Sequence, residues 1–195
     1  FDLDYAEDSA YIINADHIAK LQAQQADPDI AALLARTTPP HDAYNLRYAG
    51  WLSAKATYKG KTNQVETLLS DLSSLKIKQW DAQIQVVHLE GTSDYVAILP
   101  SARTPFVNGG IDERISQLQS LAQRLSAYPA LAATMNDVIS FHTSIDNTRN
   151  EQQQKEELVD DASDLLETAR KDISLMMYRN LGLLIDKYGS NPQFI

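Results

Sequence analysis

The chain has no cysteine, no long apolar run and no cluster of basic residues. Without cysteine there is no disulfide, no thiol nucleophile and no Cys-ligated metal, although the compartment stays open because many exported proteins also lack cysteine. No apolar run approaches the roughly 18 residues that a membrane-spanning helix requires. Acidic residues outnumber basic ones by 26 to 17, giving a net charge of −9 without a basic cluster. This balance argues against partners such as nucleic acid or an anionic membrane surface, because both are bound through Lys and Arg.

Familiar catalytic and metal-binding motifs are also missing. The sequence contains no HExxH, no Glu followed three residues later by His, and no GxSxG, so the signatures of helical zinc sites, di-iron bundles and serine hydrolases are absent. Gly60-Lys61-Thr62 resembles the end of a phosphate-binding loop, but Lys55 stands where that loop needs a glycine. We interpret the tripeptide as a polar turn of a helix. We therefore expect no enzyme activity, no catalytic or cofactor-binding residue and no resident metal.

Proline is absent from residues 131–188, and Gly182 is the only glycine there. Apolar residues recur at steps of three and four, as on one face of a helix, except in the polar run NTRNEQQQKEE. The pattern predicts one long helix with a polar middle, or two helices joined there, ended by Gly189 and Pro192. The positions of the stripe are Leu131, Met135, Val138, His142, Ile145, Val159, Ala162, Leu166, Ala169, Ile173, Met177, Leu181, Leu184 and Tyr188.

A second long helix is predicted from His41 to Leu99, before Pro100. Its apolar and aromatic stripe shows one shift of phase, where Leu72 is followed by Ile77. Residues 83–99 also have β-forming composition, so a hairpin turning at Gly91 to Asp94 is the competing interpretation. We favour helix, because the helical step continues through the supposed turn.

Shorter elements are predicted around these two segments. Residues 1–9 are acidic and are expected to form a loose lead-in. Asn14 is a plausible N-cap of a first helix. Asp27-Pro28 begins a short second helix, which Thr37, Thr38, Pro39 and Pro40 are expected to break. Residues 101–110 form a predicted loop, and an amphipathic helix follows from Asp112 and ends at Tyr128-Pro129.

Together these elements predict an all-α fold in a single domain covering residues 1–195, with a helix content above about 65%. The two long helices are expected to form an antiparallel hairpin, coiled-coil-like or an elongated bundle, with the shorter helices near its ends. If Leu99 lies level with Pro129, the numbers of facing residues add up to about 228. That register places Trp51 opposite Met177, Tyr44 opposite Leu184, and both Lys76 and Lys78 near Glu151, Glu156 and Glu157.

The histidines give a candidate for a small-ligand or metal site. In this register His88 lies opposite Ser140, close to His142, and Asp146 follows His142 by one helical turn. Two histidines and a carboxylate could hold a metal ion, although a hydrogen-bonded His142 in the seam is the more ordinary interpretation. The aromatic set Tyr44, Tyr48, Trp51 and Tyr58 is typical of a core, with a ligand groove as the alternative.

The leading hypothesis for function is a non-catalytic helical scaffold or protein-interaction module with a protein partner, either by itself or as one domain of a larger chain. The alternative is a helical bundle that binds a small ligand or metal near His88 and His142, and a third is an enzyme whose residues the sequence does not reveal. Because the sequence opens with Phe1, we expect a processed product or an excised piece, so the lack of a targeting signal says nothing. The sequence leaves the localisation and the oligomeric state open.

Overall fold

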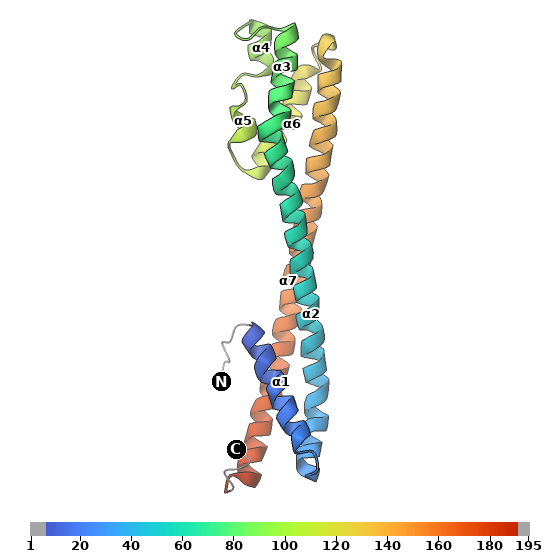
Figure 1. Cartoon of the computed structure of the whole chain (residues 1–195), viewed down its shortest axis with the longest axis vertical. Coiled ribbons are helices and arrows are strands. Elements are labelled where there is room, and N and C mark those ends of the chain that lie inside the picture. Colours follow the sequence, from blue (N-terminus) through green and yellow to red (C-terminus); the bar gives the residue numbers. More distant parts are fainter. Residues whose placement is uncertain (1–6, 191–195) are drawn as a thin grey trace. The chain divides into compact units, whose positions relative to one another are not determined.

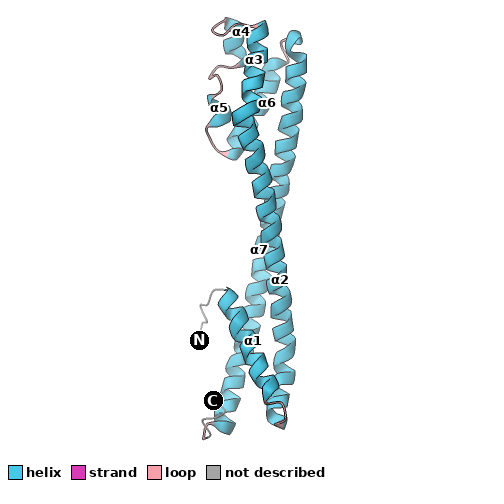
Figure 2. Cartoon of the chain, in the orientation of Figure 1, coloured by secondary structure: helices cyan, strands magenta, loops and turns pink. Residues whose placement is uncertain are grey.

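The computed structural model describes residues 7–190, and every regular element in that range is a helix (Figure 1 and Figure 2). The helical fraction of 88% confirms the predicted all-α class and the expected helix content above about 65%. Two long helices pack against each other, as predicted, and shorter helices lie nearby. In chain order the elements are α1 (Glu7–Ala23), α2 (Pro28–Asp71), the π-helical turn η1 (Leu72–Lys76), α3 (Ile77–Val87), α4 (Ser93–Ile98), α5 (Thr104–Val107), α6 (Ile111–Leu125), the 3-10 turn η2 (Pro129–Leu131) and α7 (Ala132–Tyr188).

The chain divides into two compact units, and α2 and α7 each contribute to both. Unit 1 comprises Phe1–Ala56 and Glu157–Ile195, and unit 2 comprises Thr57–Glu156. Unit 2 contains the larger apolar core, which α3, α4, α5 and α6 complete around the adjoining parts of α2 and α7. Its largest fully buried side chains include Trp80, Phe106, Leu72, Ile77, Ile84, Ile98, Leu118, Leu121, Leu125 and Ile145.

The shift of phase in the sequence corresponds to a π-helical turn. Leu72 and Ile77 are both fully buried although they are five residues apart, a spacing that a regular α-helix would place on different faces. In η1 the N–H of Ile77 donates to the carbonyl of Leu72, so the turn is one residue wider than an α-helical turn. Arg114 of α6 donates from Nη2 to the Leu69 carbonyl, at 2.7 Å, and thereby ties α6 to the turn before η1.

The predicted continuation of this helix to Leu99 is wrong, because α3 ends at Val87. His88 is extended and Gly91 has a φ of +86°, a left-handed conformation that glycine adopts without strain. The side chain of Thr92 then accepts a hydrogen bond from the N–H of Tyr95, so a new helix, α4, starts instead of the competing β-hairpin. Local capping and a glycine turn therefore outweigh the apolar periodicity.

The early end of α3 also makes the predicted register wrong. Gln83 bonds Thr134 and Trp80 bonds Asp137, so the numbers of facing residues add up to 217 rather than 228. The difference of 11 is close to the number of residues by which α3 falls short of Leu99, which had been placed level with Pro129. Lys76 consequently pairs with Asp137, and Glu151 pairs with Lys61.

α7 is a single helix, and its polar middle is accommodated by side-chain hydrogen bonds. Gln152 is only 3% exposed, its Nε2 donates to Thr62 Oγ1 at 2.9 Å, and its Oε1 accepts from Arg149 Nη1 at 2.7 Å. The polar run therefore faces a polar position of α2 and keeps its buried amide satisfied. The predicted end before Gly189 is confirmed, and so is the amphipathic helix α6.

Unit 1 is formed by α1, the first part of α2 and the last part of α7. Tyr44 is fully buried with Leu166, Ala169 and Ile173. Its predicted contact Leu184 instead packs against a separate small cluster made by α1 and α2, another consequence of the shifted register. The members of that cluster are Leu21, Ile30 and Leu33, with Leu34, Leu184 and Tyr188 packed against them.

The start of the chain differs from the prediction. α1 begins at Glu7, so residues 7–9 of the expected lead-in are helical, whereas residues 1–6 lie outside the described range. Asn14, predicted as an N-cap, is buried in the middle of α1. The predicted start of α2 at Pro28 is confirmed, and Asp27 accepts a hydrogen bond from the N–H of Asp29 at 2.9 Å.

The expected break at Pro39 and Pro40 does not occur, because α2 runs through both residues. A proline inside a helix costs about 3 kcal/mol or more, so tertiary packing must offset this cost. Leu33 and Tyr44 are buried on either side of the prolines, and a fully buried side chain of this size contributes about 1.5 to 3 kcal/mol. The burial of flanking turns therefore holds a helix that local propensity alone would interrupt.

Candidate functional site

The structure does not bring His88 and His142 together. His88 Nδ1 lies 3.4 Å from Asp94 Oδ2, and its ring meets Tyr128 edge to face at 5.0 Å. By the observed register His142 faces residue 75, roughly 20 Å along the helix from His88. Asp146 accepts from the amide of Asn150. Within residues 7–190, no three His, Asp or Glu side chains converge in a way that could hold a metal ion.

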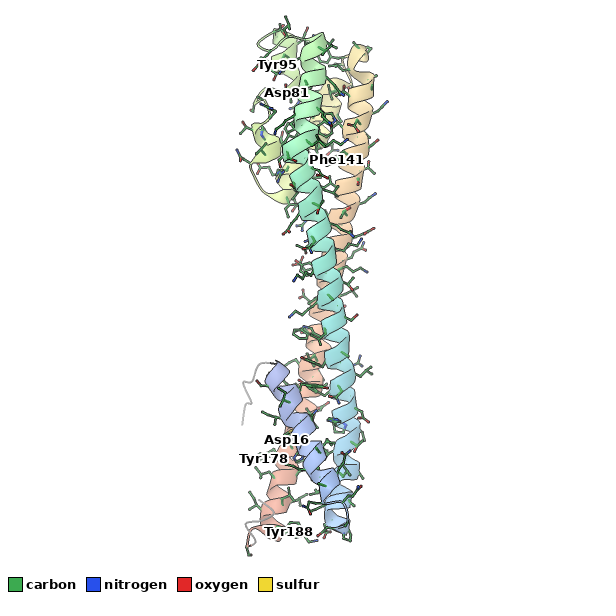
Figure 3. All side chains as sticks on the ribbon, in the orientation of Figure 1. Asp16, Asp81, Tyr95, Phe141, Tyr178 and Tyr188 are labelled. Atoms are coloured by element: carbon green, nitrogen blue, oxygen red, sulfur yellow. The ribbon has the colours of Figure 1, made fainter. Side chains whose placement is uncertain are left out.

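A buried carboxylate in unit 2 has a structural role. Asp81 of α3 accepts hydrogen bonds from the Tyr95 hydroxyl at 2.8 Å and from Gln85 Nε2 at 3.0 Å, and Arg103 lies within 3.4 Å (Figure 3). Burial and the hydrogen bond to Asp81 raise the pKa of Tyr95, so its hydroxyl stays protonated and keeps donating. These contacts join α3, α4 and the segment before α5.

A second carboxylate in unit 2 joins α7 to η1 and α3. Asp137 accepts from Trp80 Nε1 at 2.7 Å and from Lys76 Nζ at 3.1 Å. The hydrogen bond from Trp80, followed by that from Lys76, lowers the pKa of Asp137 below its ordinary value of 3.8. A lowered pKa means that the stability contributed by this carboxylate is present above pH 3.8 and is lost as the pH falls through the folded-state pKa.

Asp137→Asn is therefore expected to lower the free energy of unfolding by about 1 kcal/mol at neutral pH, the upper range for a partly exposed ion pair. The same substitution should flatten the loss of stability of unit 2 below about pH 4, because one group that titrates there is gone. Denaturant unfolding of the variant and the wild type across this pH range measures both effects. An unchanged acid dependence would show that Asp137 is not linked to folding.

Unit 1 contains a layer of polar side chains in its interior, between its two apolar clusters. Asn14, Thr37 and Asn180 are each 1% exposed or less, and they come from three different helices. We call this set the polar layer; its members are Asn14 and His17 of α1, Thr37, His41 and Asn45 of α2, and Asn180 of α7.

Asn180 is the centre of the polar layer. Its Nδ2 contacts His17 Nε2 at 3.0 Å and donates to Thr37 Oγ1 at 2.6 Å. The Thr37 hydroxyl in turn donates to the Leu33 carbonyl at 2.7 Å. One amide of α7 thus holds both α1 and α2.

Other polar atoms of the layer have no hydrogen-bond partner among residues 7–190. Asn45 Nδ2 contacts His41 Nε2 at 2.9 Å, but buried His41 Nδ1 and Asn45 Oδ1 make no hydrogen bond. Both side-chain atoms of Asn14 are also buried without a partner. Because an unsatisfied buried polar group costs about 1 to 3 kcal/mol, a layer of this kind contributes less to stability than apolar side chains of the same size.

Sequence analysis missed this layer although a signal was present. Asn14 and His17 share a helical face with Ile18 and Leu21, and Thr37 and His41 share one with Leu33 and Tyr44. The face of Thr37 and His41 was missed because a helix break was expected at Pro39, between these two residues.

The far side of α7 in unit 1 carries exposed apolar residues, which we call the outer strip: Leu175, Tyr178, Leu181, Gly182 and Ile185. Tyr178, labelled in Figure 3, is an exposed residue of α7. Its exposed fraction is 62%, and the other large side chains of the strip are about half exposed. Leu181 had been predicted in the buried stripe, and the structure corrects that assignment. Residues 175, 178, 182 and 185 follow the 3-4-3 spacing of one helix face. This face is directed away from buried Asn180.

Comparison with protein-family models, with curated proteins and with solved structures finds no match to this chain. Within the described range, no helix combines the length and the apolar character needed to cross a membrane. The function must therefore be inferred from the side chains and surfaces of the chain itself.

Proposed function

We propose that the chain is a non-catalytic helical scaffold and that it binds an amphipathic helix of a partner protein along the outer strip. The observation that supports this proposal is the exposure of four large apolar side chains at helical spacing: Leu175, Tyr178, Leu181 and Ile185. Exposed apolar residues that are scattered singly need no explanation, but a continuous strip of them on one helix face is typical of an interaction surface.

The spacing of the strip favours a helix as the partner. Positions that alternate by three and four residues form the seam of a two-helix contact, and each apolar side chain there inserts between four residues of the facing helix. Gly182 lies in the middle of this seam, and an added Cβ there would meet nothing within 4 Å, so the space above it is open. The strip spans roughly 15 Å, which is about three helical turns of a partner.

Two charged residues, Arg179 and Asp186, lie on one flank of the strip, and Arg179, which is nearer the middle, favours a different protein over a second copy of the chain. If two copies met antiparallel with Tyr178 against Gly182, the two exposed Arg179 side chains would lie on the same flank and would repel each other. A partner helix with an acidic residue on that flank would instead pair with Arg179.

A photo-crosslinking experiment tests this proposal. Tyr178 is replaced by p-benzoylphenylalanine, and the protein is irradiated in the cells that produce it. We expect one covalent adduct that maps to a helical segment of the partner. The matched control carries the same group at Leu183, which is 46% exposed but lies on another face of the same turns; it should give little adduct.

Equal crosslinking at positions 178 and 183, or none at 178, would contradict binding at the outer strip. An adduct of twice the mass of the chain would show that the partner is a second copy and would overturn the inference from Arg179. Circular dichroism of both labelled proteins should match the wild type, which excludes unfolding as the cause of any difference.

A further inference from the structure

We propose that α1 is an acid-releasable cover of unit 1: protonation of His17 breaks the hydrogen bond that joins α1 to α7, and α1 then separates from α2 and α7. This regulatory device is independent of the outer strip, which lies on the other side of α7. It depends on the polar layer, whose hydrogen bonds require His17 to be neutral.

The hydrogen bond between Asn180 and His17 fixes the protonation state of the imidazole. The contact is made by Asn180 Nδ2, which can only donate, so His17 Nε2 must be an acceptor without a proton. A proton added at this nitrogen would place two donors 3.0 Å apart. The bond would then be lost, and a charge would be left in the interior of unit 1.

The amide of Asn180 can restore the bond by turning over only if another hydrogen bond breaks. Its Nδ2 also donates to Thr37 Oγ1, and the Thr37 hydroxyl donates its own hydrogen to the Leu33 carbonyl. A turned amide would bring its oxygen against the lone pairs of Thr37, so a second hydrogen bond would have to break. The arrangement with a neutral His17 therefore makes one more side-chain hydrogen bond than the arrangement with a turned amide.

No carboxylate on the facing helices is placed to stabilise a protonated His17. Within about one turn of its level, α2 contributes Arg36 and His41, and α7 contributes Tyr178 and Arg179. On α1 itself the neighbouring charges are Asp16 and Lys20, which are exposed and paired with each other at 2.7 Å. Asp42 of α2 is exposed and lies beside His41 rather than at the level of His17.

The pKa of His17 is shifted in the direction that this arrangement requires. Burial lowers the pKa of His17 below its ordinary value of 6.5, and the charge of Asp16 opposes this effect only in part. With α1 released, His17 returns toward 6.5 and binds a proton more readily than in the closed unit. The closed state therefore has its full stability above pH 6.5 and loses stability as the pH falls below 6.5.

Release of α1 would break a small number of contacts and would uncover a defined surface. The layer already contains unpartnered Asn14, so closing α1 leaves polar groups unsatisfied. On the apolar side, Ile18 and Leu21 are buried, and Tyr11 stacks on Tyr48 at 4.9 Å. Release of α1 would expose Tyr48 and the apolar faces of α2 and α7 beneath it.

Hydrogen–deuterium exchange of the whole chain at about pH 7.5 and about pH 5.5 tests the proposal, after correction for the intrinsic pH dependence of exchange. In the released state a histidine with a pKa of 6.5 is about ten times more often protonated than neutral at pH 5.5. This protonation favours the released state by up to about tenfold, so exchange in α1 should rise by up to the same factor. Helix α6 of unit 2 is the internal reference and should not show this rise. His17→Gln should abolish the response, whereas His142→Gln, a half-buried histidine of unit 2, should leave it intact.

Asn180→Asp gives the sharpest outcome. A carboxylate at this position would accept from a protonated His17, so it should raise the pKa of His17 and reverse the sign of the response, with α1 better protected at the lower pH. The proposal is overturned if exchange in wild-type α1 rises no more than exchange in α6, or if Asn180→Asp keeps the wild-type sign. Because one variant removes the response and the other inverts it, simple loss of folding cannot imitate both results.

Discussion

Replacing Trp80 with alanine is expected to lower the free energy of unfolding of unit 2 by about 3 to 5 kcal/mol. Trp80 has no exposed surface, and its ring meets Phe141 edge to face at 5.7 Å. Its Nε1 also donates to Asp137. The truncation would therefore leave a cavity beside Phe141 and take from Asp137 the partner that does most to lower its pKa. Both effects act on the same unit, so they add to the loss of stability.

Two matched variants separate the causes of this loss. Trp80→Phe keeps most of the buried area but removes the hydrogen bond, and it should cost about 1 to 3 kcal/mol through the loss of a hydrogen bond to a charged group and the smaller ring, while Asp137 keeps its contact with Lys76. Trp51→Ala is the control, because Trp51 is the only other tryptophan, is half-buried in unit 1 and is covered on one face by Lys55 at 4.0 Å. Its truncation should cost clearly less than that of Trp80.

Chemical denaturation followed by far-ultraviolet circular dichroism measures these losses, and the fluorescence of Trp51 reports unit 1 in the Trp80 variants. Sequence analysis placed Trp51 in the seam as a core residue, but its partial exposure makes a large effect unexpected. A loss at Trp51 equal to that at Trp80 would contradict the burial of these two side chains in the structure.

The sequence predicted the helices well wherever one local pattern was sufficient. The stripe from Ile115 to Leu125 determined α6, and the residues Asp27-Pro28 and Gly189 marked a start and an end that the structure confirms. These signals depend only on neighbours within about one turn. The fold class followed from them, because long periodic segments without strand signals leave few alternatives.

Properties that depend on distant residues could not be predicted in the same way. The register depended on one assumed end of a helix, and Gly91 and Thr92 moved that end by about three turns. The helix through Pro39 and Pro40 survives because residues of α1 and α7 bury its neighbours, and no local pattern shows this. Periodicity reports which residues share a face, but packing decides what lies opposite.

The candidate sites show the same limit. The polar layer needs one residue from each of three helices, and Asn180 joins them across 163 positions of the sequence from His17. Leu181 was assigned to the buried stripe because its spacing fits two adjacent faces of α7, and only the packing of α1 and α2 shows which of these faces remains open. His88 and His142, which the predicted register had placed together, are separated by the corrected one.

Deletion of Ser74 is expected to leave the fold intact and to change the free energy of unfolding by no more than about 1 kcal/mol. Ser74 is exposed within η1, and its removal would bring Leu72 and Ile77 from five residues apart to four. Four residues is the spacing at which an ordinary α-helix keeps two side chains on one face. The π-helical turn would therefore become a regular turn, and both apolar side chains would stay in the core of unit 2.

Deletion of Thr67 is the matched control and should cost about 3 to 6 kcal/mol. Thr67 is also exposed, and its side chain bonds only the Asn63 carbonyl of its own helix. Its removal rotates the residues that follow by about 100° relative to Val65. η1 could relax to a regular turn, which would restore the buried face from Ile77 onward. Leu69 and Leu72 would still turn out of the core, and each would lower the free energy of unfolding by about 1.5 to 3 kcal/mol.

Circular dichroism and denaturant unfolding of the two deletion variants compare them directly. The expected result is a wild-type helix content for both, with a large loss of stability only for the deletion of Thr67. If the two deletions cost the same, the wide turn would not be one additional residue in an otherwise regular helix. Its geometry would then be required by the contacts that surround it, above all by the bond from Arg114 to the Leu69 carbonyl and the pairing of Lys76 with Asp137.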